Sequence, residues 1–138
     1  MRRAFCWHCK RAGPAQRTRI ALGIVTGKCA YTADFTLKYL DLKKYFDLVE
    51  AGDTRAIIKS SAMQKILTHW DIEPTHAAYI GDSGSDILES IAAGVLPLGA
   101  GWAETATIHN LSTARPFATF TSVASFTSWL DKNITVPS

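Results

Sequence analysis

Two carboxylates lie four residues apart in the segment GDSGSD, residues 81–86. The segment follows a short apolar run at 77–80 and opens a stretch with helical periodicity. Asp82 and Asp86 at this spacing suit one hard cation such as Mg²⁺, which accepts a few carboxylates and keeps several waters. The same spacing fits a helix capping box between Ser83 and Asp86. The two interpretations are compatible, with Asp82 as a metal ligand and Asp86 shared.

Two other positions suit an anion. Thr26 and Gly27 follow the apolar run 20–25, and a hydroxyl with backbone N–H groups at a strand-to-helix turn forms a cradle for phosphate. Lys59 begins the clearest helical stretch and offers a compact cation that neutralises phosphate. Taken alone, Thr26 and Gly27 favour an ordinary strand–turn–helix junction, and an isolated Lys59 favours an exposed surface lysine. Together with the two carboxylates they point to a phosphate and metal site.

The elements that position these residues alternate between strand-like and helix-like patterns. We expect strands at 20–25, 46–51, 77–80, 95–98 and 117–121, and helices at 30–40, 59–70, 83–92 and 122–132. In the helix 83–92, Ile87 and Ile91 are expected to face inward. Such alternation predicts a mostly parallel sheet with helices on both faces. Ligands of such sheets bind at the carboxyl ends of the strands.

Composition and charge narrow the class of protein. The chain has 138 residues, of which 47% are hydrophobic and 20% charged, as in a soluble one-domain protein. No apolar run approaches a membrane span and no signal-peptide pattern is present, so we expect a cytoplasmic protein with no membrane partner. Residues 1–19 carry six basic residues and no acidic one. We therefore divide the chain into a basic leader of unclear structure, 1–19, and an α/β unit, 20–138. The unit shows no basic stripe with interleaved aromatic residues, so no nucleic-acid partner is expected.

Four segments, in this order, carry a family resemblance: LGIVTGK, LKYLDLKKYFDLVEAGD, IIKSSAMQKIL and AAYIGDSGSDILESIAAGVLPLGAGWA. The stretch from Leu22 to Trp102, about 80 of the 138 residues, resembles the haloacid dehalogenase (HAD) superfamily, nearest to its phosphoglycolate-phosphatase-like branch. The resemblance implies a three-layer α/β sandwich with a Rossmann-like, HAD-type sheet. It also implies a Mg²⁺-dependent phosphatase of small phosphorylated metabolites that acts through an aspartyl-phosphate.

The resemblance also implies roles for individual residues. Thr26, with Gly27 beside it, would hydrogen-bond the transferring phosphoryl group. Lys59 would balance the charge on the phosphate. Asp82 would be a Mg²⁺ ligand, and Asp86 would be the second acidic residue of the same motif.

The first motif of the family, Asp-x-Asp-Gly-Thr, has no counterpart, because no Asp or Glu precedes Asp34. The nucleophile, the general acid and the cap domain that usually follows them are therefore missing from the pattern. We expect a central strand that is missing or replaced, and a phosphatase with impaired activity. The alternative is a catalytically inactive module that binds phosphate, metal or a partner protein.

The segment 4–9 is the only candidate for a replacement strand. Laid on the family pattern, it puts Cys6 in place of the nucleophile and His8 in place of the acid. A parallel arrangement would leave only residues 9–19, interrupted by Pro14, for the crossover. Without such a strand, the strands at 20–25 and 77–80 either pair directly or leave two exposed edges. A second copy of the chain could cover these edges in a homodimer. A Cys6-x-x-Cys9 redox or zinc protein is a further alternative.

Overall fold

The computed structural model describes residues 2–6, 21–52 and 58–133. Within these ranges the strands are β1 (Arg2–Cys6), β2 (Leu22–Cys29), β3 (Leu48–Gly52), β4 (Ala77–Gly81), β5 (Leu96–Ala100) and β6 (Ala118–Phe120). The helices are α1 (Ala30–Tyr39), α2 (Lys59–Trp70), α3 (Gly84–Ala93), α4 (Ile108–Thr113) and α5 (Val123–Asn133), with short 3-10 turns η1 (Lys43–Tyr45) and η2 (Pro74–His76). The expected α/β class is confirmed. No helix in these ranges has the length and apolar character to cross a bilayer.

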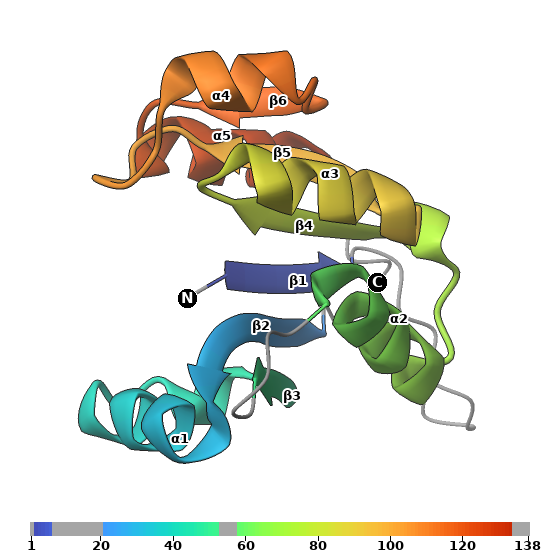
Figure 1. The fold of residues 1–138 in the computed structure, drawn as a ribbon, viewed down its shortest axis with the longest axis vertical. Helices are drawn as coiled ribbons and strands as arrows, with labels where there is room; N and C mark the ends of the chain where they lie inside the picture. Colours follow the sequence, from blue (N-terminus) through green and yellow to red (C-terminus); the bar gives the residue numbers. More distant parts are fainter. Residues whose placement is uncertain (1, 7–20, 53–57, 134–138) are drawn as a thin grey trace.

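The sheet has the strand order β3-β2-β1-β4-β5-β6. The pairs β2–β3, β4–β5 and β5–β6 are parallel, whereas β1 is antiparallel to both β2 and β4. Figure 1 shows β1 between these two strands with its arrow pointing the opposite way. The central strand is thus replaced, by residues that the sequence assigned to the leader. The strand edges that motivated the homodimer hypothesis, those of β2 and β4, are paired with β1 within one chain.

The direction of β1 has a topological explanation. Parallel neighbours need a crossover of about a dozen residues or more, usually through a helix, whereas antiparallel neighbours can be joined by a simple loop. The chain leaves β1 after Cys6 and re-enters the sheet at Leu22, and Phe5 pairs with Leu22. Because β1 is antiparallel to β2 and β4, the chain does not need the crossover that a parallel strand would require. His8, Cys9 and Pro14 lie outside the described residues.

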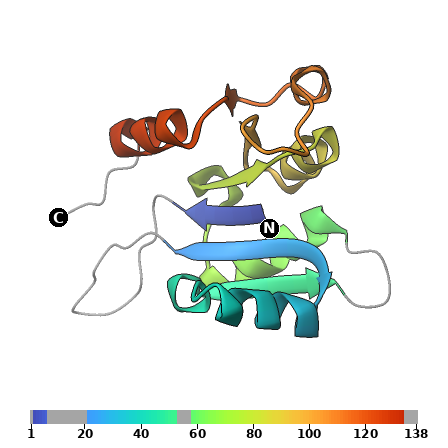
Figure 2. The same cartoon turned by 90° about the vertical axis from the view of Figure 1, so that its left-hand side faces the viewer.

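Side chains of β4 separate the two helical layers. Ala77 and Tyr79 pack with Met63 and Ile66 of α2 in one cluster. Ala78 and Ile80 pack in a second cluster, with Phe120 and with Phe126 of α5 among its members. Because successive strand residues point to opposite faces, the two clusters lie on opposite sides of the sheet. Figures 1 and 2 show α3 and α5 on opposite sides as well, which confirms the three-layer sandwich.

Two local expectations were wrong. The strand expected to end at residue 25 continues as β2 to Cys29, so Thr26 and Gly27 lie within a strand and not in a turn. In α3, Ile87 is fully buried as expected, but Ile91 is 49% exposed. The buried face of α3 includes Ser90, and Ile91 lies about 100° further round the helix. The polar Ser90 occupies the inward position because its hydroxyl donates to the Asp86 carbonyl oxygen at 2.7 Å.

Candidate functional site

A buried ion pair joins two of the predicted site residues. Lys59 is the first residue of α2, and Asp86 lies in the first turn of α3, which packs against α2. The distance from Lys59 Nζ to Asp86 Oδ1 is 2.6 Å. The Asp86 side chain is fully buried and the Lys59 side chain is 16% exposed. Tertiary packing has therefore brought together residues that are 27 positions apart in the sequence.

Asp86 also closes the predicted capping box. Its backbone N–H donates to Ser83 Oγ at 3.2 Å, and its Oδ2 accepts from the Ser83 N–H at 3.3 Å. Gly81 permits this approach, because a Cβ at that position would lie 2.5 Å from the Asp86 Cβ. One carboxylate oxygen of Asp86 thus accepts from Lys59 and the other from Ser83. Asp86 is committed to holding the starts of α2 and α3 together.

Asp82 is half-buried, directly after β4. Its Oδ2 accepts a hydrogen bond from the Thr105 hydroxyl, which comes from the loop after β5. Thr105 is a site residue that the sequence did not indicate. It lies 23 positions from Asp82 in an irregular segment, and no periodic pattern marks it. Its place follows only from β4 and β5 being parallel neighbours that end at the same edge.

Thr26 is buried in β2, 4% exposed, and pairs in register with Ala51 of β3. Gly27 is exposed and lies against Gly52, where a Cβ would come within 2.7 Å of the Gly27 carbonyl oxygen. β2 and β4 are both neighbours of β1, so their backbones lie roughly 10 Å apart, two strand spacings. Thr26 and Asp82 therefore stand on either side of the start of β1, at the same edge of the sheet.

The register of β1 decides what lies between them. Arg2 pairs with Val25 of β2, and Arg3 pairs with Ile80 of β4. The strand therefore begins at the edge where β2 and β4 end, and in Figure 2 this is also the end at which β2 bends toward α1. Cys6 pairs with Ala77, the first residue of β4, at the opposite edge. The placement of Cys6 as a substitute nucleophile is therefore wrong, because the strand runs the other way.

Glu89 of α3 stabilises the start of α2, next to Lys59. The N-cap residue of α2, Ile58, offers no side-chain cap, and the Ser60 N–H donates to Glu89 Oε2 at 2.8 Å. The pKa of the Glu89 carboxyl is lowered. The hydrogen bond from the Ser60 backbone N–H is the larger cause, and a hydrogen bond from the Ser60 side chain is the smaller one. A carboxylate at the first turn also complements the positive end of the helix dipole. Glu89 therefore caps α2 from a neighbouring helix and helps hold Lys59 in place.

The donor groups for a metal ion are few. Both oxygens of Asp86 have protein partners, and one oxygen of Asp82 accepts from Thr105. No group of three or more His, Cys, Asp or Glu side chains suited to a metal occurs in the described part of the chain. Mg²⁺ requires near-octahedral oxygen coordination, usually with one or two carboxylates. Among the described residues Asp82 is therefore the carboxylate that would hold such an ion, because both oxygens of Asp86 already have protein partners.

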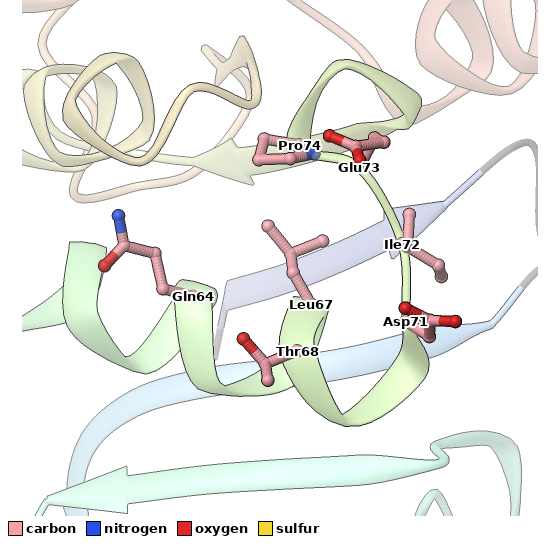
Figure 3. Close-up of a pocket in the computed structure, with 7 residues that line it drawn as sticks. All are labelled: Gln64, Leu67, Thr68, Asp71, Ile72, Glu73 and Pro74. Carbon is pink, nitrogen blue, oxygen red and sulfur yellow. The ribbon is translucent and has the colours of Figure 1, made fainter.

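A pocket of about 420 Å³ lies elsewhere, between α2 and the segment leading to β4 (Figure 3). Its lining residues are Gln64, Leu67, Thr68, Asp71, Ile72, Glu73 and Pro74. They belong to the later turns of α2 and to the chain that enters β4, so the pocket lies toward the edge where β4 begins. Its charged lining groups are the carboxylates Asp71 and Glu73, which repel phosphate. The pocket is separate from the site around Asp86.

Comparisons with known proteins agree with this geometry. The sequence profile described as haloacid dehalogenase-like hydrolase matches residues 15–100, and so does not include β1. Pyrophosphatase PpaX of Bacillus cereus is 32% identical over 83 residues, which are 59% of this chain and 38% of that protein. This chain is therefore much shorter than that relative.

Two solved structures share the fold. A haloacid dehalogenase-like hydrolase from Streptococcus pneumoniae superposes with a TM-score of 0.72 at 22% identity, over 78% of this chain and 51% of that one. A HAD-superfamily hydrolase of subfamily IA from Geobacter sulfurreducens has a TM-score of 0.64 at 24% identity, over 83% and 50% of the respective chains. This chain spans about half the length of each. The profile match covers well over half of the 138 residues, and the chain therefore belongs to the haloacid dehalogenase-like hydrolase family.

Proposed function

We propose that this chain binds phosphate or a small phosphate monoester at the carboxyl edge of its sheet, with impaired hydrolysis. The observation that carries the proposal is the Lys59–Asp86 pair. An ammonium group has three N–H donors, and the bond to Asp86 Oδ1 engages one of them. The pair therefore holds a cation in one position, next to the strand end that bears Asp82, with donor capacity for an anion.

The impairment follows from the composition of the central strand. A covalent route needs a nucleophile held beside the phosphate. In this chain the strand between β2 and β4 is β1, with the sequence RRAFC, which contains no carboxylate. An aspartyl-phosphate therefore has no residue from which to form at that position. Thr26 and Lys59 are proposed to keep their phosphate-binding roles without this step.

The metal and the substrate class belong to the same proposal. Hydrolases of this family generally use Mg²⁺, and Asp82 would be the ligand that this chain offers. The substrate class would be small phosphorylated metabolites. Pyrophosphate is a useful probe, because the Bacillus cereus relative is named a pyrophosphatase.

Titration calorimetry with inorganic phosphate and with pyrophosphate, each with and without Mg²⁺, tests the binding part. We expect binding that weakens on the order of tenfold in Lys59→Met, since a charge-assisted hydrogen bond contributes about 1.5–3 kcal/mol. Lys65→Met is the matched control, because Lys65 is on the same helix and its side chain is 72% exposed. Failure of the native chain to bind either anion in any condition would refute the proposal.

Hydrolysis of p-nitrophenyl phosphate with Mg²⁺ tests the impairment. We expect no turnover above the rate of a heat-unfolded sample. Turnover at about 1 s⁻¹ or faster, within the ordinary range for enzymes, would contradict it if Asp82→Asn abolished that activity. Loss of activity in Asp82→Asn is the control that assigns the turnover to this site and not to a contaminant.

A further inference from the structure

The outer face of α1 carries a row of exposed aromatic side chains, the α1 aromatic stripe, made of Tyr31, Phe35 and Tyr39. These residues lie four positions apart, so they follow one face of the helix. They are 81%, 61% and 80% exposed, respectively. The rings of Phe35 and Tyr39 are stacked, with their centroids 6.2 Å apart and their planes at 12°. The opposite face of α1 carries the buried residues Ala33 and Leu37. A helix that is apolar on both faces is typical of one covered on both sides.

The charges around the stripe balance one another. Residues 30–47 contain three lysines and three aspartates. All three lysines form ion pairs with aspartates of the same segment: Lys38 and Lys43 with Asp34, and Lys44 with Asp41. Lys28, just before α1, adds one positive charge. Nucleic acids and anionic membranes bind surfaces with a strong excess of positive charge. The surface around the stripe is close to neutral and does not fit these partners.

A second copy of the chain fits the stripe. Figures 1 and 2 show α1 at the β3 end of the molecule, where it forms the outer surface. An antiparallel pair of α1 helices around a two-fold axis at Phe35 would put Tyr31 of one copy beside Tyr39 of the other, and each contact would occur twice. Aromatic rings pack well in such a contact, while the tyrosine hydroxyls reach water at its rim. Because the segment is nearly neutral, two copies meet without strong repulsion between like charges.

The area of the stripe is that of a weak dimer. A buried Phe or Tyr side chain covers about 150–250 Å². At their exposures the three residues offer about 350–550 Å² in each copy, or about 700–1,100 Å² in a dimer. Stable specific interfaces bury about 1,200–2,000 Å² in total, and smaller ones belong to transient complexes. The dimer should therefore form at high protein concentration and dissociate on dilution.

We infer that the α1 aromatic stripe is a homodimer interface, in which two α1 helices pack against each other across a two-fold axis near Phe35. This inference goes beyond the proposed function and does not depend on it, because the stripe does not include the Lys59–Asp86 pair. The interface also differs from the edges of β2 and β4, which pair with β1 within one chain.

Sedimentation velocity of the native chain, from about 1 µM to about 500 µM, tests the inference. We expect the mass to rise from that of one chain toward that of two, with a dissociation constant on the order of 10–100 µM. Phe35→Asp puts a carboxylate at the two-fold axis and should weaken the dimer by at least about thirtyfold, the size of one interface hot spot. Phe35→Lys should do the same. An equimolar mixture of the two variants should associate more tightly than either alone, because opposite charges then meet at the axis.

The matched control is Leu88→Ser/Val123→Ser, which removes two exposed apolar side chains from α3 and α5. It should keep a dissociation constant within about twofold of the native value. A native chain that stays monomeric over the whole concentration range overturns the inference and leaves the stripe to a different protein or to a lipid surface. Equal association of the native chain and Phe35→Asp overturns it as well, because another face then forms the dimer. A mixture that associates no better than the single variants overturns the two-fold arrangement. The concentration series uses the native chain, so it remains decisive if a variant does not fold.

Discussion

The Lys59–Asp86 pair predicts a strong coupling between two substitutions. Asp86→Asn preserves the size of the side chain and an oxygen that can accept from the Ser83 N–H, but removes the charge. Lys59→Met preserves the apolar stem and removes the ammonium. In both single variants one charged partner stays behind in a site where the carboxylate is fully buried and the lysine is 16% exposed. In the double variant neither charge is left.

The magnitudes follow from the burial of each partner. Removing one member of a buried pair costs about 3–5 kcal/mol, because the other charge is left uncompensated. Lys59→Met should fall in that range, since Asp86 has no exposure to water. Asp86→Asn should cost less, about 2–3 kcal/mol, because the partly exposed ammonium can regain some hydration. The double variant should lose about 2 kcal/mol less than the sum of the two single losses.

Urea unfolding at neutral pH, followed by circular dichroism, gives the four free energies of unfolding for this cycle. Ser61→Ala, at an exposed position in α2, is the control for substitution in the first turns of that helix and should change stability by less than about 0.5 kcal/mol. Additive losses, with a coupling under about 0.5 kcal/mol, would show that the two side chains do not interact in solution. The contact on which the proposed site depends would then be refuted.

Three further predictions concern other parts of the molecule. Hydrogen bonds from Ser60 lower the pKa of Glu89 below its ordinary value of 4.5, so the stability they provide is present above that pH and is lost as the pH falls through the lowered value. Urea unfolding should therefore show the native chain losing more stability than Glu89→Gln between about pH 5 and pH 3. The side chain of Thr32 lowers the pKa of the exposed Cys29 thiol below 9.0, so mass-spectrometric alkylation of the Cys29 peptide should have a midpoint below that value and move upward in Thr32→Val. Deletion of residues 1–7 should open the edges of β2 and β4, and the truncated chain should sediment as larger species than the full chain.

Each of these has a result that counts against it. Parallel pH curves for the native chain and Glu89→Gln would mean that the carboxylate does not cap α2. An unchanged alkylation midpoint in Thr32→Val would remove the hydroxyl as the cause of the lowered Cys29 pKa. A truncated chain that stays monomeric with native stability would show that β1 is not needed to fill the sheet.

Local sequence patterns determined most of the individual elements. The helix expected at 59–70 coincides with α2, because Ala62, Ile66 and Trp70 repeat at helical spacing and contribute to one core cluster. The capping box at Ser83 and Asp86 was predicted from spacing alone and is present. Such features depend on residues within one or two turns of each other, so the chemistry of neighbouring residues is sufficient to predict them.

Features that depend on distant partners could not be predicted in this way. In α3, Ser90 faces inward instead of Ile91. The serine hydroxyl donates to the buried Asp86 carbonyl oxygen, and the orientation of α3 depends on its packing against α2, β5 and β4. Thr105 reaches Asp82 only because β5 returns beside β4. No periodicity in the segment around Thr105 carries that information.

The sequence by itself determined the family and the alternation of strands and helices. It also determined the residue types available for an anion, Thr26 and Lys59, and those available for its cation, Asp82 and Asp86. Tertiary structure alone decided that Asp86 holds Lys59 and that RRAFC lies in the centre of the sheet, reversed. The physical reason is that a strand's own residues do not specify its direction. Direction follows from the edges of β2 and β4 with which the strand pairs, and an antiparallel strand does not need a crossover connection. That one topological choice puts Arg2 and Arg3, and not Cys6, at the edge where β2 and β4 end.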